Sequence, residues 1–271
     1  METTAGSIAK QPPAARGAPS SKAWQLLLWR LAVAILVLVA WEFAGQSLGE
    51  RNWISRPSAI AERLVDWTRG DLWIHLLTTL WAMALGLLIG VPAGVLAGLA
   101  LGRSERWGDV MRPLVVAVYN VPLIALAPLL ILWFGLDLTP KVVLVAIVTF
   151  FILFFATFSG AQSLDGDLVA MLRLMGASPW EEFTKVVMPA SMAWIAAAMR
   201  LALPYALIDA IMGEILASRR GVGFLLTNAI SQVDMTGVYA ALVIMMVIGV
   251  SMVALAHRIE RSALKWRPAA E

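Results

Sequence analysis

Two carboxylic acids, Asp209 and Glu214, lie five residues apart inside the otherwise apolar stretch of residues 192–216. Ionisable groups in such a stretch are costly in lipid and tend to face a polar interior. Each acid could therefore contact a solute pathway or serve as a hydrogen-bonded structural group. The chain has no Cys and only two His, His75 and His257. This composition leaves no thiolate ligand and almost no imidazole, so no metal site is expected.

Hydrolytic and energy-converting chemistry has equally little support. Ser159-Gly160 could form a nucleophile site, but a serine hydrolase needs a nearby histidine, and both histidines lie at the ends of apolar runs. The phosphate-binding pattern G-x-x-x-x-G-K-[ST] is absent, so the chain is not expected to be an enzyme or to bind a cofactor. Charges paired along several spans, which would indicate a proton or sodium relay, are absent too.

The composition places the chain in a membrane. Of 271 residues, 60% are hydrophobic and 14% are charged, whereas soluble domains average about 45–50% and about 25%. A water-soluble globule cannot bury this excess, so the excess must face lipid. A soluble enzyme, a disordered chain and a fibrous protein are thereby excluded. The net charge of +3 suits basic loops beside anionic lipid better than a nucleic-acid surface.

Long apolar runs predict an all-α, polytopic membrane protein, because crossing the hydrocarbon as a helix takes about 20 apolar residues. Residues 1–22, rich in Ala, Pro, Gly and Ser, are expected to form a mobile cytoplasmic tail, and residues 23–271 a transmembrane domain. An amphipathic surface helix is expected between the first two spans. Six spans are predicted, at about 24–45, 75–102, 114–135, 142–162, 193–216 and 236–257.

The distribution of positive charge predicts the orientation. Cytoplasmic segments of membrane proteins are enriched in Lys and Arg. With the N-terminus inside, the inner segments hold thirteen of these residues and the outer ones seven, and the remaining one of the 21 is Arg200 within a span. Both termini are therefore expected in the cytoplasm.

Two spans have unusual small or helix-breaking residues. The second span repeats glycine every four residues, which predicts a groove for close helix packing, at Gly86, Gly90, Gly94 and Gly98. The third span contains Asn120-Val121-Pro122 and Ala127-Pro128, followed by Trp133. Prolines at this depth are tolerated where protein or a water-filled cavity satisfies the freed carbonyls. A simple kink is the alternative to a cavity-lining helix. Candidate pathway residues are Asn120, Trp133, Asp209 and Glu214.

The predicted cytoplasmic loop 165–190 contains a short, well-delimited helix. Ser178 and Glu181 form an S-x-x-E capping box with Pro179 at the first helical position. Gly176 permits a sharp reversal before it, and Pro189 is expected to end it. Exposed apolar residues on this helix, including Trp180, would suit either docking to another protein or an interfacial position on lipid headgroups.

The loop resembles the EAA loop of binding-protein-dependent ABC transporter permease subunits, the type I importer family. Gly176, Val186 and Pro189 have the spacing of that motif. Further hallmarks of the nitrate/sulfonate/taurine branch recur in order along the chain: Arg56-Pro57-Ser58, Thr78-Thr79, the segment from Pro128 to Trp133-Phe134-Gly135, Met175-Gly176-Ala177-Ser178, and Glu214 before Gly221-Val222-Gly223.

The resemblance implies a permease subunit in the bacterial plasma (inner) membrane, translocating a small solute such as a sulfonate-, nitrate- or taurine-like anion. It implies a second copy of the chain, two cytoplasmic ATPases that bind ATP and Mg, and an extracytoplasmic binding protein. The residues implied in coupling to the ATPases are Leu172, Met175, Gly176, Ala177, Ser178, Trp180, Glu181, Phe183 and Pro189.

One position departs from the family pattern. The Glu-Ala-Ala triplet falls on Ala170-Met171-Leu172, so the acidic residue is missing, and Asp167 lies one turn upstream. The alternative function is an energy-independent channel or secondary transporter, which would be active when reconstituted alone.

Overall fold

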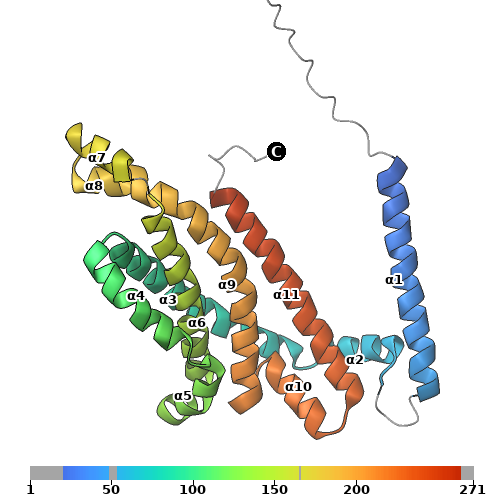
Figure 1. Cartoon of the computed structure of the whole chain (residues 1–271). Coiled ribbons are helices and arrows are strands. Elements are labelled where there is room, and N and C mark those ends of the chain that lie inside the picture. Colours follow the sequence, from blue (N-terminus) through green and yellow to red (C-terminus); the bar gives the residue numbers. More distant parts are fainter. Residues whose placement is uncertain (1–20, 49–53, 165, 264–271) are drawn as a thin grey trace, which may run out of the picture.

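The computed structural model describes residues 21–48, 54–164 and 166–263, and every regular element in these ranges is a helix (Figure 1). The predicted all-α class is confirmed. The elements are α1 (Ser21–Leu48), α2 (Pro57–Arg69), α3 (Leu72–Gly102), α4 (Glu105–Tyr119), a 3₁₀ turn (Leu123–Leu126), α5 (Ala127–Phe134), α6 (Leu138–Gln162), α7 (Gly166–Leu174), α8 (Pro179–Glu182), a π-helical segment (Phe183–Val187), α9 (Met188–Ala217), α10 (Val222–Ser231) and α11 (Met235–Ala263). Most of the predicted tail 1–22 lies outside the described residues.

Helix α6 is the centre of the bundle and packs against α3 on one side and α9 on the other. Its Val145 and Leu153 are fully buried, as are Ala202 and Ala206 of α9. These small side chains on α9 let the axes of α6 and α9 approach closely. Lipid provides no hydrophobic driving force between helices, so their association depends on such close van der Waals packing.

The glycine repeat of α3 faces α6. Gly86, Gly90, Gly94 and Gly98 are all buried in α3, and a Cβ atom at Gly98 would lie only 2.8 Å from the Phe154 carbonyl oxygen. Each of the other three glycines would likewise meet α6 atoms too closely. The repeat therefore sets the close approach of α3 and α6, and any side chain there would push the helices apart.

The predicted third span, residues 114–135, is not one continuous helix. Helix α4 ends at Tyr119, and α5 begins at Ala127 after a 3₁₀ turn. Pro122 has no backbone N–H to continue the helical ladder. The Asn120 side chain donates to the Val116 carbonyl oxygen at 2.7 Å and so occupies an acceptor of the last α4 turn. Five other described helical segments are long and apolar enough to cross a membrane.

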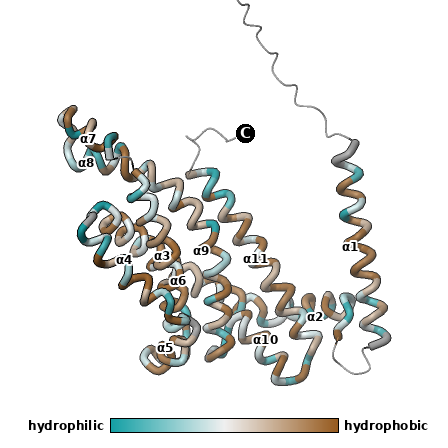
Figure 2. The backbone as a smooth tube through the Cα atoms, viewed as in Figure 1, coloured by the Kyte–Doolittle hydropathy of each residue, from teal (hydrophilic) through white to brown (hydrophobic). Residues whose placement is uncertain are grey.

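Helix α1 stands apart from the bundle (Figure 1), and hydrophobic residues cover its length (Figure 2). Its contacts are concentrated near its C-terminal end. Glu42 accepts hydrogen bonds from the Ser58 hydroxyl at 2.7 Å and backbone N–H at 3.0 Å, and Trp41 meets Tyr239 edge-on with ring centroids 5.7 Å apart. An apolar helix exposed on nearly all sides requires lipid or another protein around it.

Helices α7 and α8 lie at the end of the bundle where α1 begins and α11 ends, whereas α5 and α10 lie at the opposite end (Figure 1). The distribution of Lys and Arg predicts that the first of these ends faces the cytoplasm. The two ends are called the cytoplasmic end and the outer end below.

Candidate coupling loop and membrane cavity

The turn between α7 and α8 has the local geometry that the sequence predicts. Gly176 adopts a φ of 85°, a left-handed conformation that side chains disfavour. The Ser178 hydroxyl accepts from the Glu181 N–H at 3.3 Å, and the Glu181 carboxylate accepts from the Ser178 N–H at 3.0 Å. The predicted capping box is confirmed, and it holds the start of α8 in one orientation.

The predicted end of this helix at Pro189 is wrong. Helix α8 continues through the π-helical segment Phe183–Val187 directly into α9, and Pro189 lies in the first turn of α9. The wider π turn relieves the clash that a proline ring makes with the carbonyl four residues earlier. Residues 179–217 therefore form one continuous helical stretch, called the rod below, which bends on its way from the cytoplasmic loop to the outer end (Figure 1).

Glu182 anchors this rod to its neighbours at the cytoplasmic end. Its buried carboxylate accepts from Arg103 at 3.0 Å and from Arg173 of α7 at 3.1 Å. The hydrogen bond and negative charge of Glu182 raise the pKa of the Arg173 guanidinium, because both favour its charged form. This role of Glu182 was not predicted from the sequence. The only signal for it in the sequence was its position beside Glu181. Adjacent residues of a helix point in different directions, so two neighbouring glutamates have different surroundings.

Around this anchor lies an exposed apolar surface, the docking knob, formed by Met171, Leu174, Met175 and Trp180. The exposed fractions of Leu174, Met175 and Trp180 are 88%, 83% and 71%. No residue of α7 is buried, and α7 borders a cavity of about 880 Å³ next to the ends of α3 and α6. Leu174, the most exposed of these side chains, was not among the predicted coupling residues.

The remaining predicted coupling residues have less exposed or more polar surroundings. Phe183 is half-buried, stacks on Trp180 with ring centroids 5.7 Å apart, and packs against the cluster of Leu99 and Val187. Leu172, Ala177 and Pro189 are half-buried, and Gly176 and Ser178 are exposed. Glu181 accepts a hydrogen bond from Lys185 at 2.8 Å.

A cavity of about 510 Å³ brings together two of the four candidate pathway residues, Asn120 and Asp209. Asn120 follows the C-terminal end of α4, and Asp209 lies on α9. Tyr119 and Tyr205 line the same cavity, with Val148 of α6 on its wall. The Asp209 Oδ2 atom is buried and has no hydrogen-bond partner among the described residues, which leaves an unsatisfied acceptor at this site.

The other two candidates lie elsewhere. Trp133 is on α5, 65% exposed, and does not line this cavity. Glu214 is almost fully buried, with a 1% exposed fraction, in a polar cluster at the outer end. Glu214 shares α9 with Asp209 but does not line the cavity, and no residue of α5 lines it.

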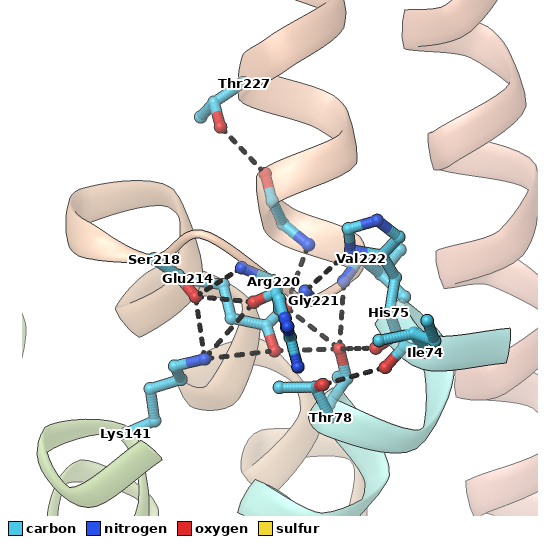
Figure 3. Close-up of polar contacts among 12 residues, drawn as sticks. Ile74, His75, Thr78, Lys141, Glu214, Ser218, Arg220, Gly221, Val222 and Thr227 are labelled. Atoms are coloured by element: carbon cyan, nitrogen blue, oxygen red, sulfur yellow. Dashed lines mark hydrogen bonds and ion pairs between the residues drawn. The ribbon is translucent and has the colours of Figure 1, made fainter. Parts of the chain in front are cut away.

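The cluster around Glu214 joins four helices, α3, α6, α9 and α10 (Figure 3). Its carboxylate accepts from the Thr79 hydroxyl of α3 at 2.8 Å and from the Gly223 N–H of α10 at 2.9 Å. Lys141 of α6 lies 3.9 Å from it and donates to Ser218 at 2.8 Å. A carboxylate at a helix N-terminus stabilises unpaired N–H groups, and here it ties α9 to the start of α10.

Two backbone groups of the glycine turn complete the cluster. The Val222 N–H donates to the Thr79 hydroxyl oxygen at 3.0 Å, and the Gly221 N–H donates to His75 Nδ1 at 3.1 Å. Gly221 has a φ of 124°, so a side chain there would be strained. The sequence signal was the order of Glu214 before a glycine-rich helix start, but the partners Thr79 and Lys141 were not predicted.

A family model and several known relatives of this chain all describe permease components of transport systems. Residues 90–265 match the family described as binding-protein-dependent transport system inner membrane component. The chain is 34% identical over 257 residues to a putative aliphatic sulfonates transport permease protein of Escherichia coli, covering 92% of this chain and 95% of that protein. It is 30% identical over 233 residues to a formylaminopyrimidine transport permease protein of Halalkalibacterium halodurans, covering 86% and 93%.

A third relative is the riboflavin transport system permease protein of Chloroflexus aurantiacus, 30% identical over 263 residues, covering 94% of this chain and 97% of that one. Among solved structures, a bacterial ABC transporter that imports alginate matches with a TM-score of 0.62 at 16% identity, covering 89% and 99%. The inward-facing MetNI methionine ABC transporter matches with a TM-score of 0.57 at 20% identity, covering 72% and 95%. These structures support the fold.

Proposed function

This chain belongs to the family of binding-protein-dependent transport system inner membrane components, and we propose how its docking knob drives translocation. The chain is a multi-pass inner-membrane permease subunit of an ABC importer. In our proposal two copies form the pore, two cytoplasmic ATPases grip the two docking knobs, and a binding protein delivers the solute at the outer end. ATP and Mg bind the ATPases and not this chain.

The observation that carries the coupling proposal is the continuous rod from Pro179 to Ala217. A force applied to Trp180 or Met175 enters the rod at its cytoplasmic end. Because Glu182 ties the rod to Arg103 and Arg173, the ends of α3 and α7 move with it. The same rod bears Asp209 on the cavity, so rotation of α8 re-orients the cavity wall without crossing a loop.

The proposed cycle is alternating access between two global states. ATP binding draws the ATPases together, swings the paired rods, and turns the pore from inward-open to outward-open. Each ligand shifts the equilibrium only by its different affinity for the two states. We place the solute pathway at the cavity that Asn120 and Asp209 line, and we assign Glu214 a different role, as the clamp that keeps α9, α3 and α10 together at the outer end.

The cargo class is a finer proposal. A sulfonate-, nitrate- or taurine-like anion agrees with the hallmarks of the resemblance and with the relatives named as sulfonate permeases. Other relatives are named for formylaminopyrimidine and riboflavin, which are larger nitrogen heterocycles. The acidic side chain of Asp209 on the cavity favours a cargo with a donor group over a bare anion.

Gly176 provides the test of coupling. Substitution with Val has open space around its Cβ but forces a strained backbone, since φ is positive, and so should misdirect the docking knob. In proteoliposomes that contain the complete transporter, Gly176→Val should lower uptake per ATP hydrolysed by about tenfold or more, the effect of losing about 1.4 kcal/mol of productive contact.

The matched control is Gly135→Val. Gly135 also has a positive φ, 79°, and open space, but it follows α5 at the outer end. Normal coupling in Gly176→Val would refute the coupling role. Uptake by the chain reconstituted without ATPases would instead favour the channel or secondary transporter.

A further inference from the structure

We propose that the cavity between α4, α6 and α9 binds a nitrogen-bearing donor group of the cargo. The transported solute then carries an ammonium or amino N–H group, and a bare oxyanion such as nitrate or an alkanesulfonate is not accepted. This inference rests on the proposed function in one respect, because it takes the cavity to lie on the route of the solute.

The cavity offers acceptors from Asp209 and Asn120, beside the hydroxyl groups of Tyr119 and Tyr205, which can donate or accept. Asp209 Oδ2 is buried without a partner among the described residues. The Asn120 amide nitrogen donates one of its two N–H groups to the Val116 carbonyl oxygen at 2.7 Å, and the Asn120 Oδ1 atom is a further acceptor. A buried acceptor without a donor is costly. A solute that brings N–H groups would satisfy both residues.

The charges around the cavity also favour a solute with a donor group over an oxyanion. No Lys, Arg or His is among the described residues that line it. The nearest basic residues along the same rod and on α6 have other partners: Arg200 pairs with Glu260 at 3.1 Å, and Lys141 donates to Ser218. In its ionised form Asp209 would repel an oxyanion, and an ammonium group beside it would favour that ionised form.

The size and walls of the cavity suit a small organic solute. Its volume of about 510 Å³ lies in the usual range of ligand pockets. Val148 and Ile152 supply an apolar wall, and Tyr119 and Tyr205 supply aromatic rings. The Tyr119 ring is held by Phe151 and Phe155, with centroids 5.4 and 5.3 Å away. Aromatic faces attract cations and stack on heterocycles.

The test measures binding to the full chain in nanodiscs without ATPases or ATP. Saturation-transfer NMR would compare taurine with ethanesulfonate, which differ by one ammonium group, and would add cytosine as an amino heterocycle. We expect signals from taurine, cytosine or both, and none from ethanesulfonate. Asp209→Asn should weaken the binding by about fivefold to tenfold, the difference between a charged and a neutral acceptor. Asn120→Leu should weaken it too.

Ser191→Ala is the matched control, because the Ser191 hydroxyl is also buried without a partner and lies on α9 away from the cavity; its binding should equal that of the wild type. A taurine signal alone assigns an aminosulfonate, and a cytosine signal alone assigns an amino heterocycle. The proposal is overturned if ethanesulfonate binds as well as taurine, if Asp209→Asn leaves binding unchanged, or if no probe binds.

Failure of the proposed function would look different. If the complete transporter showed no ATP-driven uptake while the nanodisc binding kept its preference for N–H donors, the importer mechanism would fall and the cavity assignment would stand. If the complete transporter instead took up alkanesulfonates with ATP, and Asp209→Asn did not change that uptake, the cavity assignment would fall and the importer mechanism would stand.

Discussion

The two ends of the helix bundle hold a buried glutamate in different ways. At the cytoplasmic end, the partners of Glu182 are Arg103 and Arg173, whose side chains are 32% and 64% exposed. At the outer end, the partner of Glu214 is Lys141, whose side chain is 1% exposed. Water therefore reaches the charged partners of Glu182, whereas the charged partner of Glu214 is shielded from it.

This difference separates a movable end from a fixed end. Partly exposed ion pairs gain little net free energy and exchange partners readily, which suits a loop that a partner protein displaces. A buried charge that loses its partner is strongly destabilising, which suits a joint that must remain closed. The rod of residues 179–217 connects the two, so its motion is expected to pivot about the outer clamp.

The largest effect is expected from breaking the outer clamp. Glu214→Gln leaves the buried Lys141 ammonium without its counter-charge and should lower the free energy of unfolding by about 3–5 kcal/mol. The loss can be measured by titrating the detergent-solubilised chain with SDS and following its helical circular dichroism.

A second substitution sharpens this result. Adding Lys141→Met removes the stranded charge at similar volume, so the double variant should recover part of the lost stability. A Glu260→Gln control, at the more exposed pair with Arg200, should change stability little. If Lys141→Met brought no recovery, the charge pair would not be the reason for the clamp.

A smaller loss of stability is expected at the movable end. Glu182→Gln leaves Arg103 and Arg173 able to reach water, so Tm should fall by only roughly 2–4 °C, as for a loss near 1 kcal/mol. Uptake per ATP should nevertheless drop, because the rod loses its link to α3 and α7. Thermal unfolding and a proteoliposome uptake assay would measure the two effects separately. A loss of stability equal to that of Glu214→Gln would erase the contrast between the two ends.

The smallest effect is expected on the exposed face of the loop. Lys185→Ala removes an exposed i, i+4 pair with Glu181, while Ser178 still holds Glu181 through the capping box. Such pairs contribute little and are screened by salt. The change in Tm should stay within about 1 °C and vanish at high ionic strength. A larger, salt-independent change would mean that the α8 cap depends on Lys185.

Parts of the site were predictable because their signals are local. The capping box needs only Ser178 and Glu181, three residues apart, and the reversal needs only Gly176. The end of the helix at Pro189 was predicted wrongly, because the usual effect of proline was offset by a π turn that has no simple sequence signature. The third span was predicted as one helix, with a kink as the alternative to a cavity-lining helix, and the break between Tyr119 and Ala127 was not predicted.

The amino-acid sequence by itself determined that the chain is helical and embedded in lipid, because composition and the length of apolar runs decide where a backbone can satisfy its hydrogen bonds. It also determined the glycine face of α3 and the start of α8, which depend on neighbours within one or two turns. Only the tertiary structure decided that Asn120 and Asp209 share a cavity and that Lys141 meets Glu214. Those pairs are far apart in the chain, and their meeting depends on how closely whole helices pack.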